Sequence, residues 1–163
     1  YEECGRDAGH HRTEYLTDIS KKDFKMKHYK IKDMQIGMTE SFTVSITEEM
    51  QNAFTEISGD TNPMHLDEEY AKAKGYEGKL VYGMLTSSLY SRLAGVYLPG
   101  ENCILQEVRS RFHAPVYIGD TLTVMGTVEE VHEAVKMIKV KAVVVNQNGV
   151  KVSQATIQAM LTE

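Results

Sequence analysis

Asp60 and His65 place a carboxylate and an imidazole five residues apart, with Asn62 and Pro63 between them. The Asn-Pro step is a turn signal, and such a turn folds the chain so that both side chains face one cavity. An Asp and a His together can hold a water molecule and move its proton, because imidazole titrates closest to neutral pH. The spacing therefore indicates acid–base chemistry on a bound water.

A structural interpretation of the same segment competes with the catalytic one. Asp and Asn are frequent turn residues because their side chains bond to nearby backbone N–H groups. Asp60 and Asn62 would then cap the turn, and His65 would be a polar surface residue. Spacing alone favours this interpretation.

Several other kinds of site are missing from the sequence. It has no Gly-rich phosphate loop ending in Lys-Ser/Thr, no Gly-x-Gly-x-x-Gly and no Gly-x-Ser-x-Gly. This argues against nucleotide hydrolysis, dinucleotide redox and serine-hydrolase chemistry. Cys4 and Cys103 lie far apart without a CxxC pair, so we expect no metal site and no disulfide framework. Reduced thiols and the lack of an apolar signal core in residues 1–20 predict a cytoplasmic protein.

The elements that position these residues begin with helices. Thr47 is a typical N-cap and Gly59 a natural stop, which predicts a helix between them. Four positions with helical spacing are expected to form its apolar face: Met50, Ala53, Phe54 and Ile57. A short helix is predicted over 68–74, and a long one from Gly83 to about Tyr97. The long helix is rich in small residues, which suits close wrapping by other backbone.

Strands are predicted on either side of these helices. Apolar and polar residues alternate over 41–46 and in four further segments after the long helix. In the first of these four, Ile104, Val108 and Phe112 are expected to point one way. Asn148-Gly149 predicts a hairpin turn before the last strand. Helices segregated from an antiparallel sheet make an α+β domain.

The composition fits one folded domain with an extension. Of the 163 residues, 42% are hydrophobic and 25% charged, close to globular averages. Residues 1–27 have few apolar positions, so we expect an N-terminal extension there and the main domain over 28–163. The net charge of −5 argues against nucleic-acid binding. No apolar run approaches the ~18 residues of a membrane span.

The segment 54–67 with its Asp-x-Asn-Pro-x-His core, together with Gly83-Met84-Leu85 and 115–122, resembles the MaoC-like (R)-specific enoyl-CoA hydratases. The similarity runs from about His28 to the C-terminus. It implies a hot-dog fold, in which an antiparallel sheet wraps a long central helix. It also implies a homodimer that binds acyl-CoA, or an acyl chain on a carrier protein, at the subunit boundary. The coenzyme A belongs to the substrate, and the resemblance implies no cofactor and no metal.

The resemblance assigns roles to individual residues. The family's catalytic pair corresponds to Asp60 and His65, and its oxyanion-hole amide to the N–H of Gly83. His65 would take a proton from water as that water attacks C3, while Asp60 would orient the water and protonate C2. Asn62 corresponds to a substrate-positioning residue. Ser91 corresponds to a serine that supports the pair, with a small packing residue as the alternative.

Tyr82 departs from the family pattern, which has His immediately before Gly-Met-Leu. Either its ring shapes the thioester site, and so substrate choice, or Tyr82 is a packing aromatic whose hydroxyl is hydrogen-bonded.

The leading functional expectation is reversible (R)-specific hydration of a trans-2-enoyl-CoA to a 3-hydroxyacyl-CoA. Two alternatives remain open at this point. One is a hot-dog thioesterase, in which water attacks the thioester carbon. The other is a non-catalytic acyl-CoA-binding module, because a fold alone does not determine an activity.

Overall fold

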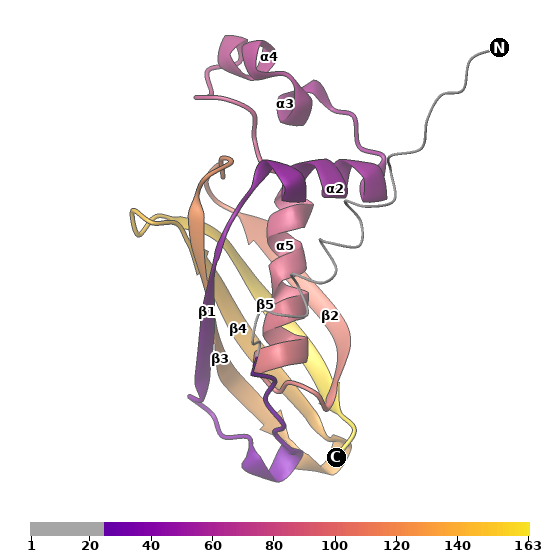
Figure 1. Cartoon of the computed structure of the whole chain (residues 1–163). Coiled ribbons are helices and arrows are strands. Elements are labelled where there is room, and N and C mark those ends of the chain that lie inside the picture. The colour runs from indigo at the N-terminus through magenta and orange to yellow at the C-terminus, as the bar shows by residue number, and fades with distance from the viewer. Residues whose placement is uncertain (1–24) are drawn as a thin grey trace, which may run out of the picture.

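A five-stranded antiparallel sheet curves around one helix in the computed structural model, which describes residues 25–163 (Figure 1). The strands are β1 (Thr39–Ser45), β2 (Cys103–Phe112), β3 (Thr121–His132), β4 (Met137–Val145) and β5 (Lys151–Leu161). Their order across the sheet is β1-β3-β4-β5-β2, so β1 and β2 are the edges. Most of the predicted N-terminal extension, residues 1–24, lies outside the described part of the chain.

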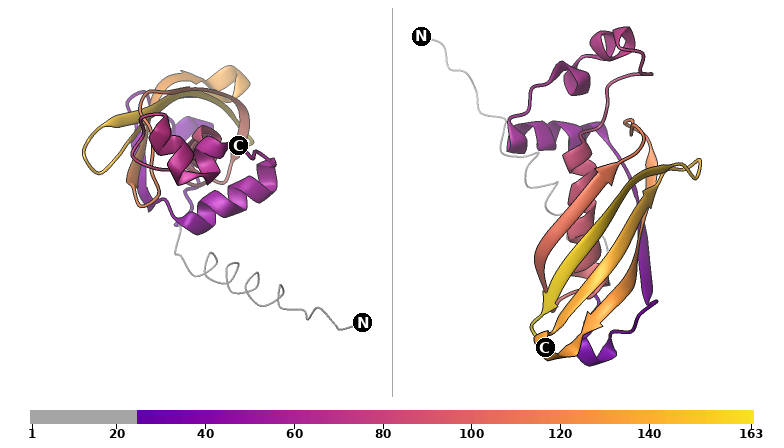
Figure 2. Two further views of the ribbon diagram at one scale, coloured as in Figure 1. Left: turned by 90° about the horizontal axis from the view of Figure 1, so that it is seen from above. Right: turned by 180° about the vertical axis from the view of Figure 1, so that it is seen from behind.

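The central helix is α5, and three further helices gather at one end of it. The α-helices are α2 (Glu48–Ser58), α3 (Pro63–Leu66), α4 (Glu68–Ala73) and α5 (Gly83–Arg92). The short irregular helices are η1 (Ile31–Asp33), η2 (Leu93–Tyr97) and η3 (Glu133–Val135). In the rear view of Figure 2 the sheet lies in front of α5 and wraps around it, while α2, α3 and α4 lie over the N-terminal end of α5. The predicted α+β arrangement is confirmed.

The core lies between the concave face of the sheet and α5. Alternating residues of the three inner strands are buried there: Leu122, Val124 and Val128 in β3, Ile138, Val140, Ala142 and Val144 in β4, and Ala155, Ile157, Ala159 and Leu161 in β5. Leu85, Leu89 and Leu93 meet them from the helix side. Each fully buried Val, Leu or Ile side chain among them stabilises the fold by about 1.5–3 kcal/mol relative to an exposed one. The sheet packs closely on the helical segment inside it: a Cβ on Gly126 of β3 would lie only 2.7 Å from Leu93 Cδ2.

The helix boundaries follow the predicted signals. Thr47 Oγ1 accepts a hydrogen bond from the Met50 amide at 3.3 Å and caps α2. Gly59 ends that helix with a φ of 68°, a left-handed conformation that glycine adopts without strain. The predicted long helix is confirmed from Gly83 to Tyr97, with its last turn, η2, wound as a π-helix.

The predicted apolar face of α2 is wrong at its C-terminal end. Ile57 is 82% exposed, whereas Gln51 is only 1% exposed. Gln51 and Thr55, one turn apart, share the inward side of the helix. A polar side chain is stable there because every one of its polar atoms is hydrogen-bonded, as described below.

The predicted face of β2 is wrong at one residue. The register of β2 against β5 shifts between Leu105 and Glu107, which marks a β-bulge. One extra residue reverses the faces, because successive side chains of a strand alternate. Ile104 therefore lies on the face opposite to Val108 and Phe112. A bulge has no apolar or polar signature, so alternation alone missed it.

The last hairpin turn, the Cys103 thiol and the lengths of the helices each bear on an expectation from the sequence. The predicted turn at Asn148-Gly149 joins β4 to β5, and Gly149 has a φ of 74°. Burial raises the pKa of the Cys103 thiol to about 11, so this cysteine is an uncharged packing group at neutral pH. None of the helices within residues 25–163 is long and apolar enough to cross a membrane.

Candidate active site

The Asp-x-Asn-Pro-x-His segment forms a tight turn that leads directly into α3. Asp60 Oδ1 accepts a hydrogen bond from the Asn62 amide at 3.0 Å. Asn62 Oδ1 in turn accepts one from the Met64 amide at 3.0 Å and caps α3. Both side chains are exposed. The capping hydrogen bonds expected from the structural interpretation are therefore present. They also fix the start of α3, the helix that carries His65.

His65 is held in one ring orientation. Its Nδ1 lies 2.8 Å from the backbone oxygen of Leu80. Because a carbonyl oxygen can only accept, Nδ1 carries a proton in this contact, and Nε2 is the nitrogen left to exchange a proton. The ring also stacks on Tyr82, with centroids 4.0 Å apart and planes inclined by 33°. His65 is thus a half-buried imidazole with a basic Nε2, and not a free surface side chain.

Tyr82 connects the two members of the predicted pair. Its ring is 2% exposed, and its hydroxyl donates to the backbone oxygen of Asp60 at 2.6 Å. The same hydroxyl lies 2.9 Å from Thr55 Oγ1 of α2. Asp60 is therefore tied to the hydroxyl end of Tyr82, while His65 covers the ring. Asp60 and His65 therefore both contact Tyr82. The Tyr82 hydroxyl bonds to the backbone oxygen of Asp60 and not to the Asp60 carboxylate.

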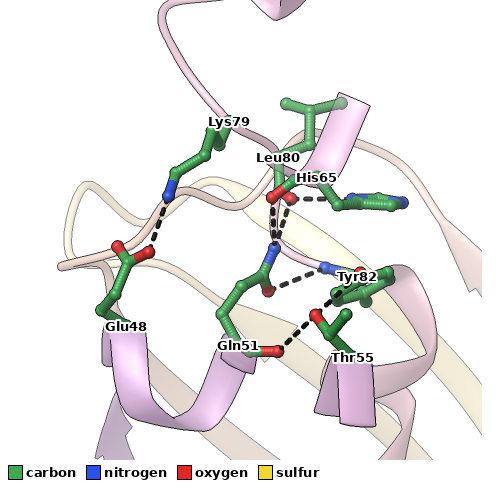
Figure 3. A network of polar contacts seen from close by, with 7 residues as sticks. All are labelled: Glu48, Gln51, Thr55, His65, Lys79, Leu80 and Tyr82. Atoms are coloured by element: carbon green, nitrogen blue, oxygen red, sulfur yellow. Dashed lines mark hydrogen bonds and ion pairs between the residues drawn. The ribbon is translucent and has the colours of Figure 1, made fainter. Parts of the chain in front are cut away.

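Gln51 is a site residue that the sequence analysis missed (Figure 3). Its Nε2 donates to the backbone oxygens of His65 at 3.2 Å and Leu80 at 2.9 Å. Its Oε1 accepts from the Tyr82 amide at 3.4 Å. One buried amide thus joins α2, α3 and the chain that enters α5. The sequence carries no signal for it, because a single glutamine on a helix has the same appearance whether it is buried or solvated.

His65 and Gly83 line a common cleft of about 320 Å³. Most of its wall is apolar. The wall residues include His65, Leu80, Gly83, Thr86, Phe112 and Val116. Clefts with apolar walls and a few placed polar groups are the usual form of small-molecule sites. Tyr82 is not part of this wall, and its buried ring supports the site from within the core.

Gly83 begins α5 at the cleft wall, and no side chain among residues 25–163 caps this helix N-terminus. The first amides of a helix have no acceptor within it, and the N-cap residue Tyr82 makes no side-chain cap. These N–H groups and the positive end of the helix dipole suit a negatively charged oxygen. A Cβ at this position would lie 3.1 Å from Phe112 Cζ, so a larger residue would require the Phe112 ring to shift by a few tenths of an ångström.

Asp60, Asn62 and Ser91 lie outside the cleft wall. Asn62 caps α3, as described above. Ser91 is exposed on α5, eight residues beyond Gly83, which is about 12 Å along the helix axis. Among the described residues no hydrogen bond joins Ser91 to Asp60 or His65. The expected support of the pair by Ser91 therefore stays a prediction.

Known proteins match both the sequence and the fold. The family model described as MaoC like domain matches residues 32–151. An (R)-specific enoyl-CoA hydratase of Rhodospirillum rubrum is 37% identical over 101 residues, which are 62% of this chain and 69% of that protein. A mitochondrial 3-hydroxyacyl-[acyl-carrier-protein] dehydratase of Arabidopsis thaliana is 43% identical over 70 residues, which are 43% of this chain but only 41% of that protein.

A solved structure agrees with these sequence matches. The unliganded R-hydratase PhaJ1 from Pseudomonas aeruginosa superimposes with a TM-score of 0.77 at 31% identity, covering 82% of this chain and 86% of that one. The matched family segment contains the Asp-x-Asn-Pro-x-His turn, α5 and most of the sheet. The chain belongs to the MaoC-like domain family and has the hot-dog fold of its R-hydratases.

Proposed function

We propose that this chain catalyses the reversible (R)-specific hydration of a trans-2-enoyl-CoA to a 3-hydroxyacyl-CoA, which makes it a lyase. One observation carries the proposal: an oriented imidazole, His65, and an uncapped helix N-terminus, Gly83, share one apolar cleft. The relatives named above as R-hydratases support the same activity.

The chemistry divides among three groups. His65 Nε2 takes a proton from water, whose oxygen forms a bond to C3 of the enoyl thioester. The C2–C3 double-bond electrons shift toward the thioester, and the negative charge on its oxygen is stabilised by the Gly83 N–H. Asp60 orients the water and gives a proton to C2, and it regains that proton when His65 releases its own. Water is the only second substrate, and we assign no cofactor or metal to the reaction.

Asn62 and Tyr82 position these groups in the proposed site. Asn62 fixes the start of α3 and so the direction of His65. The Tyr82 ring stacks on the His65 ring, and the Tyr82 hydroxyl donates a hydrogen bond to the Asp60 backbone oxygen. We therefore assign Tyr82 an indirect effect on substrate placement, although it stands where the family has His.

We further propose that the active form is a homodimer joined along β2. This edge strand exposes large apolar side chains, with Ile104 51%, Leu105 40% and Phe112 47% exposed. Exposed strand edges of this kind are normally paired or covered. A second chain on this edge would cover Phe112, which packs on Gly83, and would place the cleft at the subunit boundary. The acyl chain of the substrate is carried by coenzyme A or by a carrier protein, as the relatives' names suggest.

Incubation of the chain with crotonyl-CoA tests the function. A hydratase removes the enoyl absorbance without releasing a free thiol, because the thioester stays intact. A thioesterase would release thiol, and a binding module would change neither signal. We expect loss of the enoyl absorbance alone; either other outcome would overturn the proposal. The same assay with crotonyl-acyl carrier protein decides between the two carriers.

A further inference from the structure

Thr86 lines the cleft and carries a buried hydroxyl that has no hydrogen-bond partner among residues 25–163. The residue is 2% exposed and lies on α5, one turn beyond Gly83. Buried polar groups are almost always hydrogen-bonded, so an exception calls for an explanation.

The usual internal partner does not satisfy this hydroxyl. A helical Thr commonly bonds to the carbonyl three or four residues earlier. Four residues before Thr86 is Tyr82, and its carbonyl accepts the Thr86 amide at 3.2 Å but not the hydroxyl. Helical Thr has two accessible χ1 rotamers, so the hydroxyl can turn toward the cleft without moving the backbone.

The position of Thr86 relative to Gly83 indicates which ligand atom it meets. Residues three apart on a helix share a face, and both of these residues line the cleft. A thioester oxygen bound at the Gly83 N–H therefore lies beside the Thr86 side chain. Oxyanion sites commonly use more than one donor, and the hydroxyl is the next polar group on this helix face.

We propose that the Thr86 hydroxyl binds the thioester oxygen of the substrate as a second donor beside the Gly83 N–H. This proposal rests on the proposed hydratase function, which supplies the thioester. The substrate then supplies the partner that the hydroxyl lacks among residues 25–163. It also assigns Thr86 to transition-state stabilisation, since the charge on that oxygen grows as water adds to C3.

The test compares Thr86→Val, which replaces the hydroxyl by a methyl, with Thr86→Ser, which keeps the hydroxyl. Calorimetry measures the Kd of butyryl-CoA, which is saturated and does not react, and of S-butyl-CoA, a thioether without the carbonyl oxygen. We expect Thr86→Val to weaken butyryl-CoA binding about tenfold, the scale of one hydrogen bond, and to leave S-butyl-CoA unchanged. Thr86→Ser should keep the difference between the two ligands. Equal effects on both ligands, or no effect on either, would overturn the proposal.

Two further measurements separate this role from a structural one. Thr86→Val should lower kcat/KM for crotonyl-CoA by about a hundredfold, as loss of one oxyanion donor does elsewhere. Its thermal midpoint should stay level or rise, because an unpaired hydroxyl has been replaced by a methyl group. A clear fall in the midpoint would instead indicate a structural hydrogen bond and contradict the proposal.

The calorimetry also keeps the two proposals apart. If the wild-type chain binds butyryl-CoA but does not hydrate crotonyl-CoA, the hydratase function fails, while the ligand pair still decides the contact of Thr86. If hydration is normal and Thr86→Val behaves as wild type, only the assignment of Thr86 fails. If the wild-type chain binds neither ligand, both proposals are overturned.

Discussion

Tyr82 links Asp60 and His65 through its two ends. The ring stacks under the imidazole, and the hydroxyl holds the turn that carries the carboxylate. Removing the hydroxyl and removing the ring should therefore have different effects. The first loosens one backbone contact, whereas the second removes the surface on which His65 lies.

We predict that Tyr82→Phe keeps most of the activity and that Tyr82→Ala loses up to about a hundredfold in kcat/KM, the scale of a displacement of about 1 Å. Tyr82→His, which restores the usual family residue, should stay active and shift the preference for acyl chain length. Kinetics with short and medium enoyl-CoA substrates measure this. Tyr90→Phe is a matched control, because Tyr90 is equally buried, bonds to Ser153 at 2.7 Å and is not a wall residue of the cleft. If Tyr82→Phe is as inactive as Asp60→Asn, the hydroxyl takes part in the chemistry and its assigned role is wrong.

At the scale of elements, Gln51 joins α2 to the segment that carries His65 and to the start of α5. These elements are short and belong to no sheet, so hydrogen bonds across their ends determine their relative positions. One side chain makes three of those bonds. Its replacement should affect both stability and the geometry of the site.

We predict that Gln51→Leu, similar in size but without polar atoms, lowers the free energy of unfolding by about 2–4 kcal/mol, because it leaves buried carbonyl and amide groups unpaired. The activity should fall as well, since His65 and Tyr82 lose a common support. Urea unfolding and kcat/KM measure the two effects. Asn52→Leu changes the neighbouring exposed residue of the same helix and should alter neither. An unchanged unfolding midpoint in Gln51→Leu would contradict the account of this network.

The helices and strands also show which features of the fold can be predicted from the sequence. Local signals were sufficient where the cause is local: Thr47 and Gly59 bound α2, and alternation identified the buried faces of β3, β4 and β5. The predictions failed at Ile57 and Ile104, where the outcome depends on the partner element. The side of α2 that is buried depends on the polar groups opposite it, and the bulge in β2 depends on its pairing with β5.

Part of the candidate site could also be predicted from the sequence. The motif located His65 and Gly83, which the fold brings to one cleft. It could not reveal Gln51 or the unpaired hydroxyl of Thr86, because burial and hydrogen bonding of single polar residues arise only from the tertiary structure. The resemblance also suggested that Ser91 supports the pair, and this stays a prediction: Ser91 lies about one and a half turns beyond Thr86, the last residue of α5 in the cleft wall.

At the scale of the whole molecule, the β2 edge should decide the oligomeric state. We predict that light scattering at micromolar concentration gives twice the mass of one chain. Leu105→Lys should shift the chain toward monomer and reduce hydration, because a charge on the edge opposes strand pairing. Val135→Lys is the matched control, since Val135 is 58% exposed on η3 and is not part of β2. A wild-type monomer with full activity would show that the site is complete within one chain.

The most direct test of the central claim is the hydration rate of crotonyl-CoA by Asp60→Asn and His65→Gln. Asparagine keeps the side-chain oxygen that accepts from the Asn62 amide, so Asp60→Asn removes the acid while retaining the turn. Asp67→Asn is its control, because Asp67 caps α4 in the same way through the Tyr70 amide.

We predict that each catalytic variant loses about a hundredfold or more in kcat/KM, the usual scale for general acid–base groups. The double variant should lose less than the product of the two, because both groups act on one water. Asp67→Asn should retain wild-type turnover. Near-wild-type turnover by a folded Asp60→Asn or His65→Gln chain would contradict the account, and the turn would then have only its capping role.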